Sequence, residues 1–296
     1  MDLDCRAWHQ LHLVISVPTG PDLMPASPKR LIRRAHPPGR LYAIWDQREA
    51  LMALTFRQIR GRFAKPVIGL AWLILQPALQ AVVFSLFFGL LVRVPSDGTP
   101  YPAMVFTGVA LWHLVQHSAS EGANAFISAA PLLRQTPMPR LYPVLAASLS
   151  ATVDATIALF IAVLAGLLFG THPGWALLMA PLFVAVALLA SLGLSALLAA
   201  LCGVWRDVRQ LVPLGLQILM FSSPVIYPAS LIPEGWQKLY ALNPFSGIIS
   251  GLRWSLLGAP SPDLVNLGIS IGSAMALAGL GLWTFLALEG RAADEL

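Results

Sequence analysis

The chain has 296 residues, of which 57% are hydrophobic and only 11% are charged. Because an ordinary soluble domain carries about 25% charged residues, this composition excludes a water-soluble globular protein and predicts an all-α integral membrane protein. The net charge of +5 does not indicate nucleic-acid binding. Eleven of the 19 lysines and arginines lie before Val67, ahead of the first apolar stretch, as is typical of a membrane orientation signal.

The N-terminal part divides into an extension and a helix. Residues 1–40 contain no convincing signal-peptide cleavage site, and we expect them to form a poorly ordered extension. Residues 41–66 are predicted to form a cytoplasmic amphipathic interfacial helix, because Trp45, Met52 and Phe56 fall on one stripe at the helical period. The same stripe would fit a helix packed on a cytoplasmic partner protein. The interfacial basic cluster consists of Arg57, Arg60, Arg62 and Lys65.

Residues 67–296 are predicted to form a membrane domain with six transmembrane helices, because about 18 or more consecutive apolar residues cross a bilayer. The spans are expected at 67–92, 102–120, 142–169, 175–204, from 211 onward, and 264–288. Pro77 should kink the first span. Span five should break at Ser222-Ser223-Pro224, and Asp154 is the one carboxylate expected inside the membrane. The polar stretch 121–141 should be a loop with a short helix.

A shorter charge-free segment, 239–252, lies between spans five and six, and Asn243-Pro244 interrupts it. Its fourteen residues are too few for an ordinary span, which favours a re-entrant outer hairpin. A seventh full span is the alternative, and it would reverse only the C-terminal end.

The basic residues are distributed asymmetrically along these segments. With both termini in the cytoplasm, sixteen lie inside and three, Arg93, Lys238 and Arg253, lie outside. The positive-inside rule therefore predicts a multi-pass membrane protein with both termini cytoplasmic.

Several catalytic and binding motifs are absent from the sequence. There is no G-x-x-x-x-G-K-[ST] loop, and the only lysines are Lys29, Lys65 and Lys238, so we expect no ATP site in this chain. There is also no H-E-x-x-H or G-x-S-x-G motif, and Cys5 and Cys202 have no metal-ligand spacing. We therefore expect neither an enzyme nor a bound cofactor.

From Trp45 to the C-terminus, the sequence resembles, in register, the type 2 ABC exporter permeases of the O-antigen, capsular polysaccharide and teichoic acid group. The similar motifs are Arg57-Gln58-Ile59-Arg60-Gly61-Arg62-Phe63, Gln76-Pro77, Pro139-Arg140-Leu141, Arg206-Asp207-Val208-Arg209, Ser223-Pro224-Val225-Ile226-Tyr227-Pro228 and Asn243-Pro244. Ala64 and Pro66 depart from the family pattern, as does Gln135, which stands where a lysine is common.

The resemblance implies a permease subunit that works as a homodimer with two ABC ATPase subunits, which bind the ATP and Mg. It implies that a polyprenyl-linked glycan passes through the dimer interface. Membrane lipids surround the protein, and no nucleic-acid partner is expected. The resemblance also implies an ATPase-coupling segment with Leu133, Arg134, Gln135 and Arg140, although these residues would also fit a positive-inside anchor. The candidate channel aromatics, which would equally fit an interfacial belt, are Phe84, Phe87, Phe88, Phe106 and Tyr227. Arg206 and Asp207 are expected to form a structural cytoplasmic pair.

Two other functions stay open from the sequence. One is a drug or lipid exporter with the same type of permease, which a genomic neighbourhood of glycosyltransferases would disfavour. The other is a membrane-embedded transferase acting on lipid-linked sugars. It would need a catalytic acid or base facing a cavity, and the available groups are Glu121, Asp154, His113 and His117. Turnover by the purified protein without an ATPase would establish the transferase.

Overall fold

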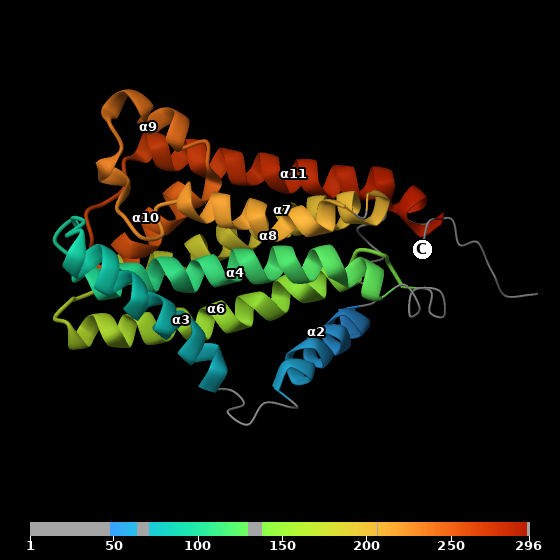
Figure 1. Cartoon of the computed structure of the whole chain (residues 1–296), viewed down its shortest axis with the longest axis horizontal. Helices are drawn as coiled ribbons and strands as arrows, with labels where there is room; N and C mark the ends of the chain where they lie inside the picture. The colour runs from blue at the N-terminus through green and yellow to red at the C-terminus, as the bar shows by residue number, and fades with distance from the viewer. Residues whose placement is uncertain (1–47, 64–70, 130–137, 206, 295–296) are drawn as a thin grey trace, which may run out of the picture. The chain divides into compact units, whose positions relative to one another are not determined.

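The computed structural model describes residues 48–63, 71–129, 138–205 and 207–294, all within one compact unit, Ile44–Leu296. These residues form helices and no strands, as expected of an all-α protein (Figure 1). The elements are α2 (Arg48–Phe63), α3 (Trp72–Phe84), the π-helix η2 (Ser85–Leu91), α4 (Tyr101–Ser128), α6 (Tyr142–Leu168), the 3-10 helix η3 (Trp175–Met179), α7 (Ala180–Val204), α8 (Val208–Phe221), the 3-10 helix η4 (Ala229–Leu231), α9 (Glu234–Tyr240), α10 (Pro244–Leu257) and α11 (Leu264–Asp294). The expected N-terminal extension, residues 1–40, lies outside the described residues.

Four helical segments are long and apolar enough to cross a membrane: Trp72–Leu91, Tyr142–Leu168, Trp175–Val204 and Leu264–Glu289. They coincide with the predicted spans one, three, four and six. The second and fifth predicted spans are present as α4, which has 28 residues but is more polar, and α8, which has only 14 residues. Composition and length alone therefore identify four spans in the described part of the chain.

The predicted end of the second span was wrong. We expected a loop from Glu121, but α4 continues to Ser128. The residues after Glu121 include two alanines, which favour the helix, and a helix need not end where its apolar stretch ends.

The first span changes its helical form along its length. Pro77 is buried inside α3, and seven residues of π-helix follow, which the sequence did not predict. Gly89 allows this segment to approach α4 closely, because a Cβ there would lie 2.7 Å from the ring of Tyr101.

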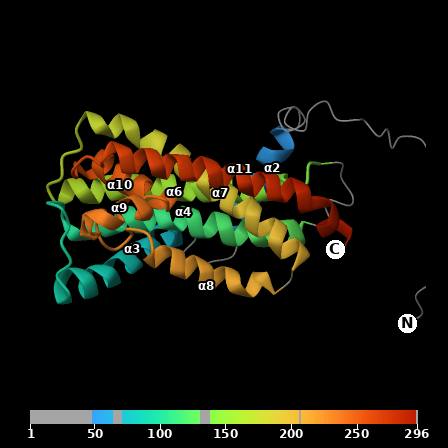
Figure 2. The ribbon, with the colours of Figure 1, turned by 90° about the horizontal axis from the view of Figure 1, so that it is seen from above.

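The core forms around α4, which packs against α6 and α7, while α7 also packs against α11 (Figures 1 and 2). Trp112 is fully buried and meets the ring of Phe245 edge-on, with 6.1 Å between the ring centroids. Small polar residues join the helices, since the Ser118 and Ser148 hydroxyls lie 2.7 Å apart and Ser195 donates to the Ser118 carbonyl. These contacts are typical of helices packed inside a bilayer.

The bundle has two distinct ends (Figure 1). We call the end with α9 and α10 the hairpin end, and the opposite end, where α11 finishes, the tail end. The Asn243-Pro244 break separates α9 from α10, as predicted, and Gly258 ends α10 in the left-handed conformation, with φ of 69°. Whether this hairpin is re-entrant stays a prediction.

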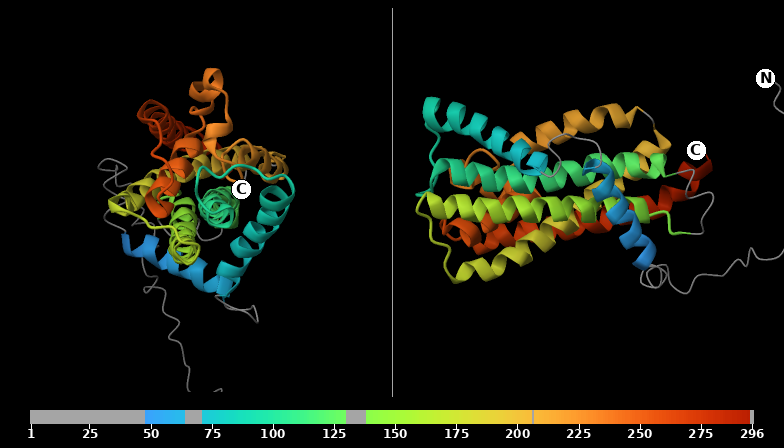
Figure 3. Two further views of the ribbon diagram at one scale, coloured as in Figure 1. Left: turned by 90° about the vertical axis from the view of Figure 1, so that its left-hand side faces the viewer. Right: turned by 90° about the horizontal axis from the view of Figure 1, so that it is seen from below.

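α2 lies beside α6 at an angle to the bundle (Figure 3). Met52 and Phe56 of the predicted apolar stripe are exposed, while Thr55 is buried. Arg57 and Arg60 are exposed as well, whereas the side chain of Arg62 and the whole of Lys65 lie outside the described residues. The placement of this helix on a membrane surface stays a prediction.

Candidate functional site

Three apolar helices meet around a small group of polar side chains. α3 and α8 lie on the same side of α4 (Figures 2 and 3). Nε2 of His113 on α4 lies 3.0 Å from Oε1 of Gln80 on α3, and Nε2 of the same glutamine lies 4.0 Å from the sulfur of Met220 on α8. One amide side chain therefore connects all three helices.

Further amides on these helices are exposed. Gln76 lies one turn before Gln80 on α3, Gln116 lies one turn after His113 on α4, and the side chains of both are exposed. Gln217 on α8 is also exposed. Gly215 borders a cavity between α8 and α7, and Gln217 lies on the opposite flank of α8. We call Gln76, Gln80, His113, Gln116 and Gln217 the polar face.

The polar face cannot lie against lipid tails at low cost. An amide without a hydrogen-bond partner in hydrocarbon costs several kcal/mol, by an estimate of about 4–8 kcal/mol for transfer from water to cyclohexane. Apolar side chains surround it on the same helices, because Leu79, Leu214 and Ile218 are each more than half exposed. This surface therefore fits contact with water, a polar substrate or a second polypeptide.

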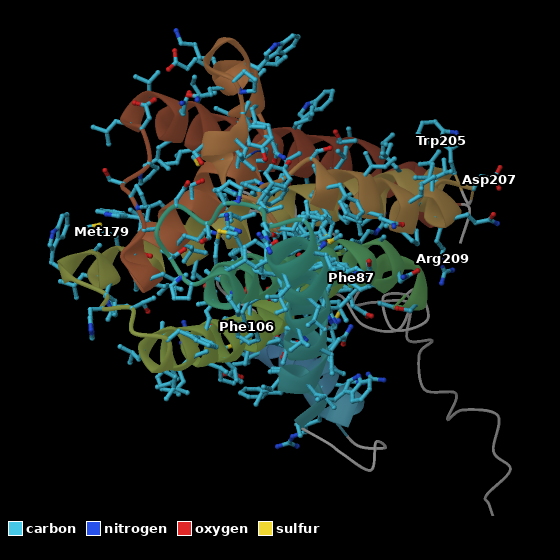
Figure 4. All side chains as sticks on the ribbon, turned by 60° about the vertical axis from the view of Figure 1, so that its left-hand side comes forward. Phe87, Phe106, Met179, Trp205, Asp207 and Arg209 are labelled. Atoms are coloured by element: carbon cyan, nitrogen blue, oxygen red, sulfur yellow. The ribbon has the colours of Figure 1, made fainter. Side chains whose placement is uncertain are left out.

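The five candidate channel aromatics occupy different environments. The rings of Phe84 and Phe88 meet edge-on, with 6.1 Å between their centroids, whereas Phe106 is buried and Phe87 is 56% exposed (Figure 4). Tyr227 lies beyond α8, where its hydroxyl donates to the Phe221 carbonyl at 2.9 Å. A channel function for these rings stays a prediction.

The predicted cytoplasmic groups fall at the tail end, as far as the structure describes them. Asp207 is exposed near Trp205 and Arg209, with Met179 at the opposite end (Figure 4). Arg206 lies outside the described residues, so the pair stays a prediction. Leu133, Arg134 and Gln135 of the coupling segment also lie outside them. Arg140 is exposed, and its guanidinium donates to the Glu289 carbonyl of α11 at 2.7 Å.

The segment 222–228, between α8 and η4, has little regular helix but well-paired carbonyl groups. Asn243 donates to the Ser222 carbonyl at 3.0 Å, and Tyr101 donates to the Ile226 carbonyl at 2.7 Å. The Arg253 guanidinium donates to the Val225 carbonyl at 2.8 Å and to the Tyr227 carbonyl at 3.0 Å. Irregular backbone at membrane depth requires such internal partners.

Arg253, which the sequence interpretation counted on the outer side of the membrane, lies at the hairpin end and is buried. The side chain is only 4% exposed, and its third hydrogen bond runs from Nε to the Met104 carbonyl at 3.3 Å. The available signal was that Arg253 is the one charged residue of α10, because an ionisable residue among apolar ones is usually buried against protein.

The fold and the polar face define a helical membrane protein whose apolar spans carry a hydrogen-bonding surface. Residues 49–257 match the family described as ABC-2 type transporter, and the chain belongs to this family. This finding confirms the family resemblance seen in the sequence motifs.

Among curated relatives, the O-antigen export system permease protein RfbA of Klebsiella pneumoniae is 25% identical over 242 residues, covering 80% of this chain and 92% of the relative. The RfbA protein of Myxococcus xanthus is 26% identical over 214 residues, covering 71% and 81%. The polysialic acid transport protein KpsM of Escherichia coli is 20% identical over 243 residues, covering 82% and 93%.

Proposed function

We propose that this chain is the membrane permease subunit of an ATP-driven exporter that moves a lipid-linked polysaccharide, of O-antigen or capsule type, across the bacterial inner membrane. The names of its relatives support polysaccharide export. The polar face carries the proposal, because it places exposed amides on three adjoining helices of a membrane protein.

A glycan chain can supply the hydrogen-bond partners that the polar face would lack against lipid tails. Sugar hydroxyls both donate and accept hydrogen bonds, as the amides of Gln76, Gln116 and Gln217 do. In the proposed homodimer, the polar faces of two copies enclose the pathway, so that neither water nor glycan meets the lipid tails. The exposed leucines and valines beside the face contact the second copy or the lipid part of the substrate.

The proposed topology has six spans, with the hairpin end outside and both termini in the cytoplasm. At about 1.5 Å per residue, the 28 residues of α4 extend about 42 Å, more than the hydrocarbon core of about 30 Å. The 14 residues of α8 extend only about 21 Å. In this topology, the segment 222–228 completes the fifth span after α8. Irregular backbone is tolerated there because its carbonyl groups have hydrogen-bond partners.

Two ABC ATPase subunits supply the energy in this proposal and bind the ATP and Mg. They dock at the tail end through the coupling segment that contains Leu133, Arg134, Gln135 and Arg140. The hydrogen bond from Arg140 to α11 supports this location, because it joins the end of the segment to a second membrane helix.

Export in a strain that lacks the chromosomal copy of this gene tests the proposal. We expect the strain to accumulate glycan inside the cell and the wild-type chain to restore surface glycan. The double variant Gln116→Leu/Gln217→Leu removes two hydrogen-bonding groups and should reduce export roughly thirtyfold, at about 1 kcal/mol for each group and about 1.4 kcal/mol for each factor of ten. Leu182→Ala on α7, an exposed position outside the polar face, is the matched control.

The outcomes separate the parts of the proposal. Full export by the double variant would refute the proposal that the polar face lines the glycan pathway. Unchanged surface glycan in the deletion strain would refute polysaccharide export itself and turn attention to a drug or lipid substrate.

A further inference from the structure

A cavity of about 230 Å³ lies at the hairpin end, between α9, α10, the loop 258–263 and the first turn of α11. A cavity of about 150 Å³ holds benzene, and pockets for drug-sized ligands measure about 300–1,000 Å³. This cavity therefore has room for one six-membered ring with its substituents, and not for two such rings side by side.

The wall of the cavity combines apolar surface with polar groups that donate or accept hydrogen bonds. Asn266 supplies an amide, Ser250 a hydroxyl, and Asp97 and Asp263 supply carboxylates, while Tyr240 adds an aromatic side chain. An acyl chain would fit only the apolar part of this wall and would leave these polar groups without partners.

Several of these groups have unused hydrogen-bonding capacity. Within the described part of the chain, the side-chain amide of Asn266 makes no hydrogen bond, and only one oxygen of Asp263 accepts one, from the Asn266 backbone N–H at 3.0 Å. The Ser250 hydroxyl donates to the Ser246 carbonyl at 2.9 Å and keeps its lone pairs. Arg253 uses three of its five N–H groups on carbonyl oxygens.

The charges around the cavity are of both signs and favour neither small anions nor small cations. Two carboxylates, Asp97 and Asp263, oppose an anion such as phosphate, and the buried guanidinium of Arg253 opposes a cation. The described residues also hold no group of three or more His, Cys, Asp or Glu side chains suited to a metal ion. A neutral ligand with several hydroxyl groups fits these charges and the unused hydrogen-bonding groups of the wall.

Arg253 makes part of this wall rigid. Its hydrogen bonds fix α10 to the carbonyls of Met104 on α4 and of Val225 and Tyr227 in the segment 222–228. Across the cavity, both oxygens of Asp97 accept from the Ser230 hydroxyl at 2.9 Å. Groups held in this way keep the cavity formed without a ligand, which lowers the entropy lost on binding.

We propose that this cavity binds one neutral pyranose residue of the polysaccharide on the outer side of the membrane. The inference rests on the proposed function, because that function places a glycan at the hairpin end. Asn266 and Asp263 recognise the ring hydroxyls, and Tyr240 provides the apolar part of the wall.

Binding by the purified full-length chain in detergent tests the site directly. The probes are the methyl pyranosides of glucose, galactose, mannose and rhamnose, measured by saturation-transfer NMR. We expect saturable binding of at least one probe, with no competition from inorganic phosphate. Asn266→Leu and Asp263→Asn should each weaken it about five- to tenfold, since each removes or alters one hydrogen-bonding group. Asparagine still caps a helix, so Asp263→Asn keeps the start of α11.

Thr284→Val is the matched control, because Thr284 lies on the same helix far from the cavity and its hydroxyl bonds only the Leu280 carbonyl. This variant should bind the probe as the wild type does. Binding of no probe, or binding unaffected by both Asn266→Leu and Asp263→Asn, would overturn the subsite. Absence of binding together with normal glycan export would refute this inference and leave the proposed function standing.

Discussion

Replacing Arg253 with methionine tests how strongly the buried guanidinium stabilises the segment 222–228. Methionine has similar length and no donor, so the variant loses all three hydrogen bonds. The Met104 carbonyl lies inside α4 and keeps its helical partner, but those of Val225 and Tyr227 lose theirs. Each buried carbonyl without a partner costs about 1–3 kcal/mol. Because the buried charge and its desolvation cost disappear as well, we expect a net loss of about 2–4 kcal/mol in the free energy of unfolding.

Thermal unfolding in detergent measures the global effect of this substitution. At about 2–4 °C per kcal/mol for a chain of this size, the melting temperature should fall by about 5–15 °C. Hydrogen exchange should accelerate most in peptides that cover the segment 222–228. Arg209→Met is the matched control, because Arg209 is exposed on α8 and makes no hydrogen bond among the described residues, so it should change stability by less than about 0.5 kcal/mol.

Gly108→Ala perturbs the same contact without removing the arginine. A Cβ at Gly108 would lie 2.5 Å from the Val225 carbonyl oxygen and 3.0 Å from a terminal nitrogen of Arg253. We therefore expect faster exchange in the same peptides. If Arg253→Met left both the melting temperature and the exchange of the segment 222–228 unchanged, the reasoning about these hydrogen bonds would be refuted.

Three further predictions concern topology, energy coupling and the hairpin. A cysteine at Ser96 should react with an impermeant thiol reagent in intact cells and one at Gln135 should not; reaction at Gln135 would contradict the proposed orientation. Arg140→Glu should abolish export and lower recovery of the ATPase in pull-downs while the permease still inserts, and normal results in both assays would exclude a coupling function. Asn243→Ala removes the helix cap on α10 and two donated hydrogen bonds, so the free energy of unfolding should fall by about 1–2 kcal/mol in denaturant titrations, and an unchanged value would show that water replaces these bonds.

Four of the spans were predictable because apolar length is a local property of the sequence. The third span was expected at 142–169 and the structure shows α6 from Tyr142 to Leu168; the fourth was expected at 175–204 and ends at Val204. The break at Asn243-Pro244 was predictable for a similar reason, since proline begins helices but does not continue them.

The polar face and the Arg253 contacts were not predictable, because they depend on which helices become neighbours. Gln80, His113 and Met220 are far apart in the sequence, and only the packing of α3 and α8 on α4 brings them together. The sequence showed Arg253 as a charge near an expected outer loop. Its burial follows from the carbonyl groups of another segment, which no local pattern reveals.

The hairpin end also explains why apolar length alone identifies fewer spans than the proposed six. α8, α9 and α10 are each shorter than an ordinary transmembrane helix, and each ends in backbone that lacks helical partners. Asn243 joins the end of α8 to the start of α10, and Arg253 joins α10 to the segment that follows α8. These side chains supply hydrogen bonds that a continuous helix would make internally. In the proposed topology, these short helices can therefore lie at membrane depth as one cross-linked unit, although none could do so alone.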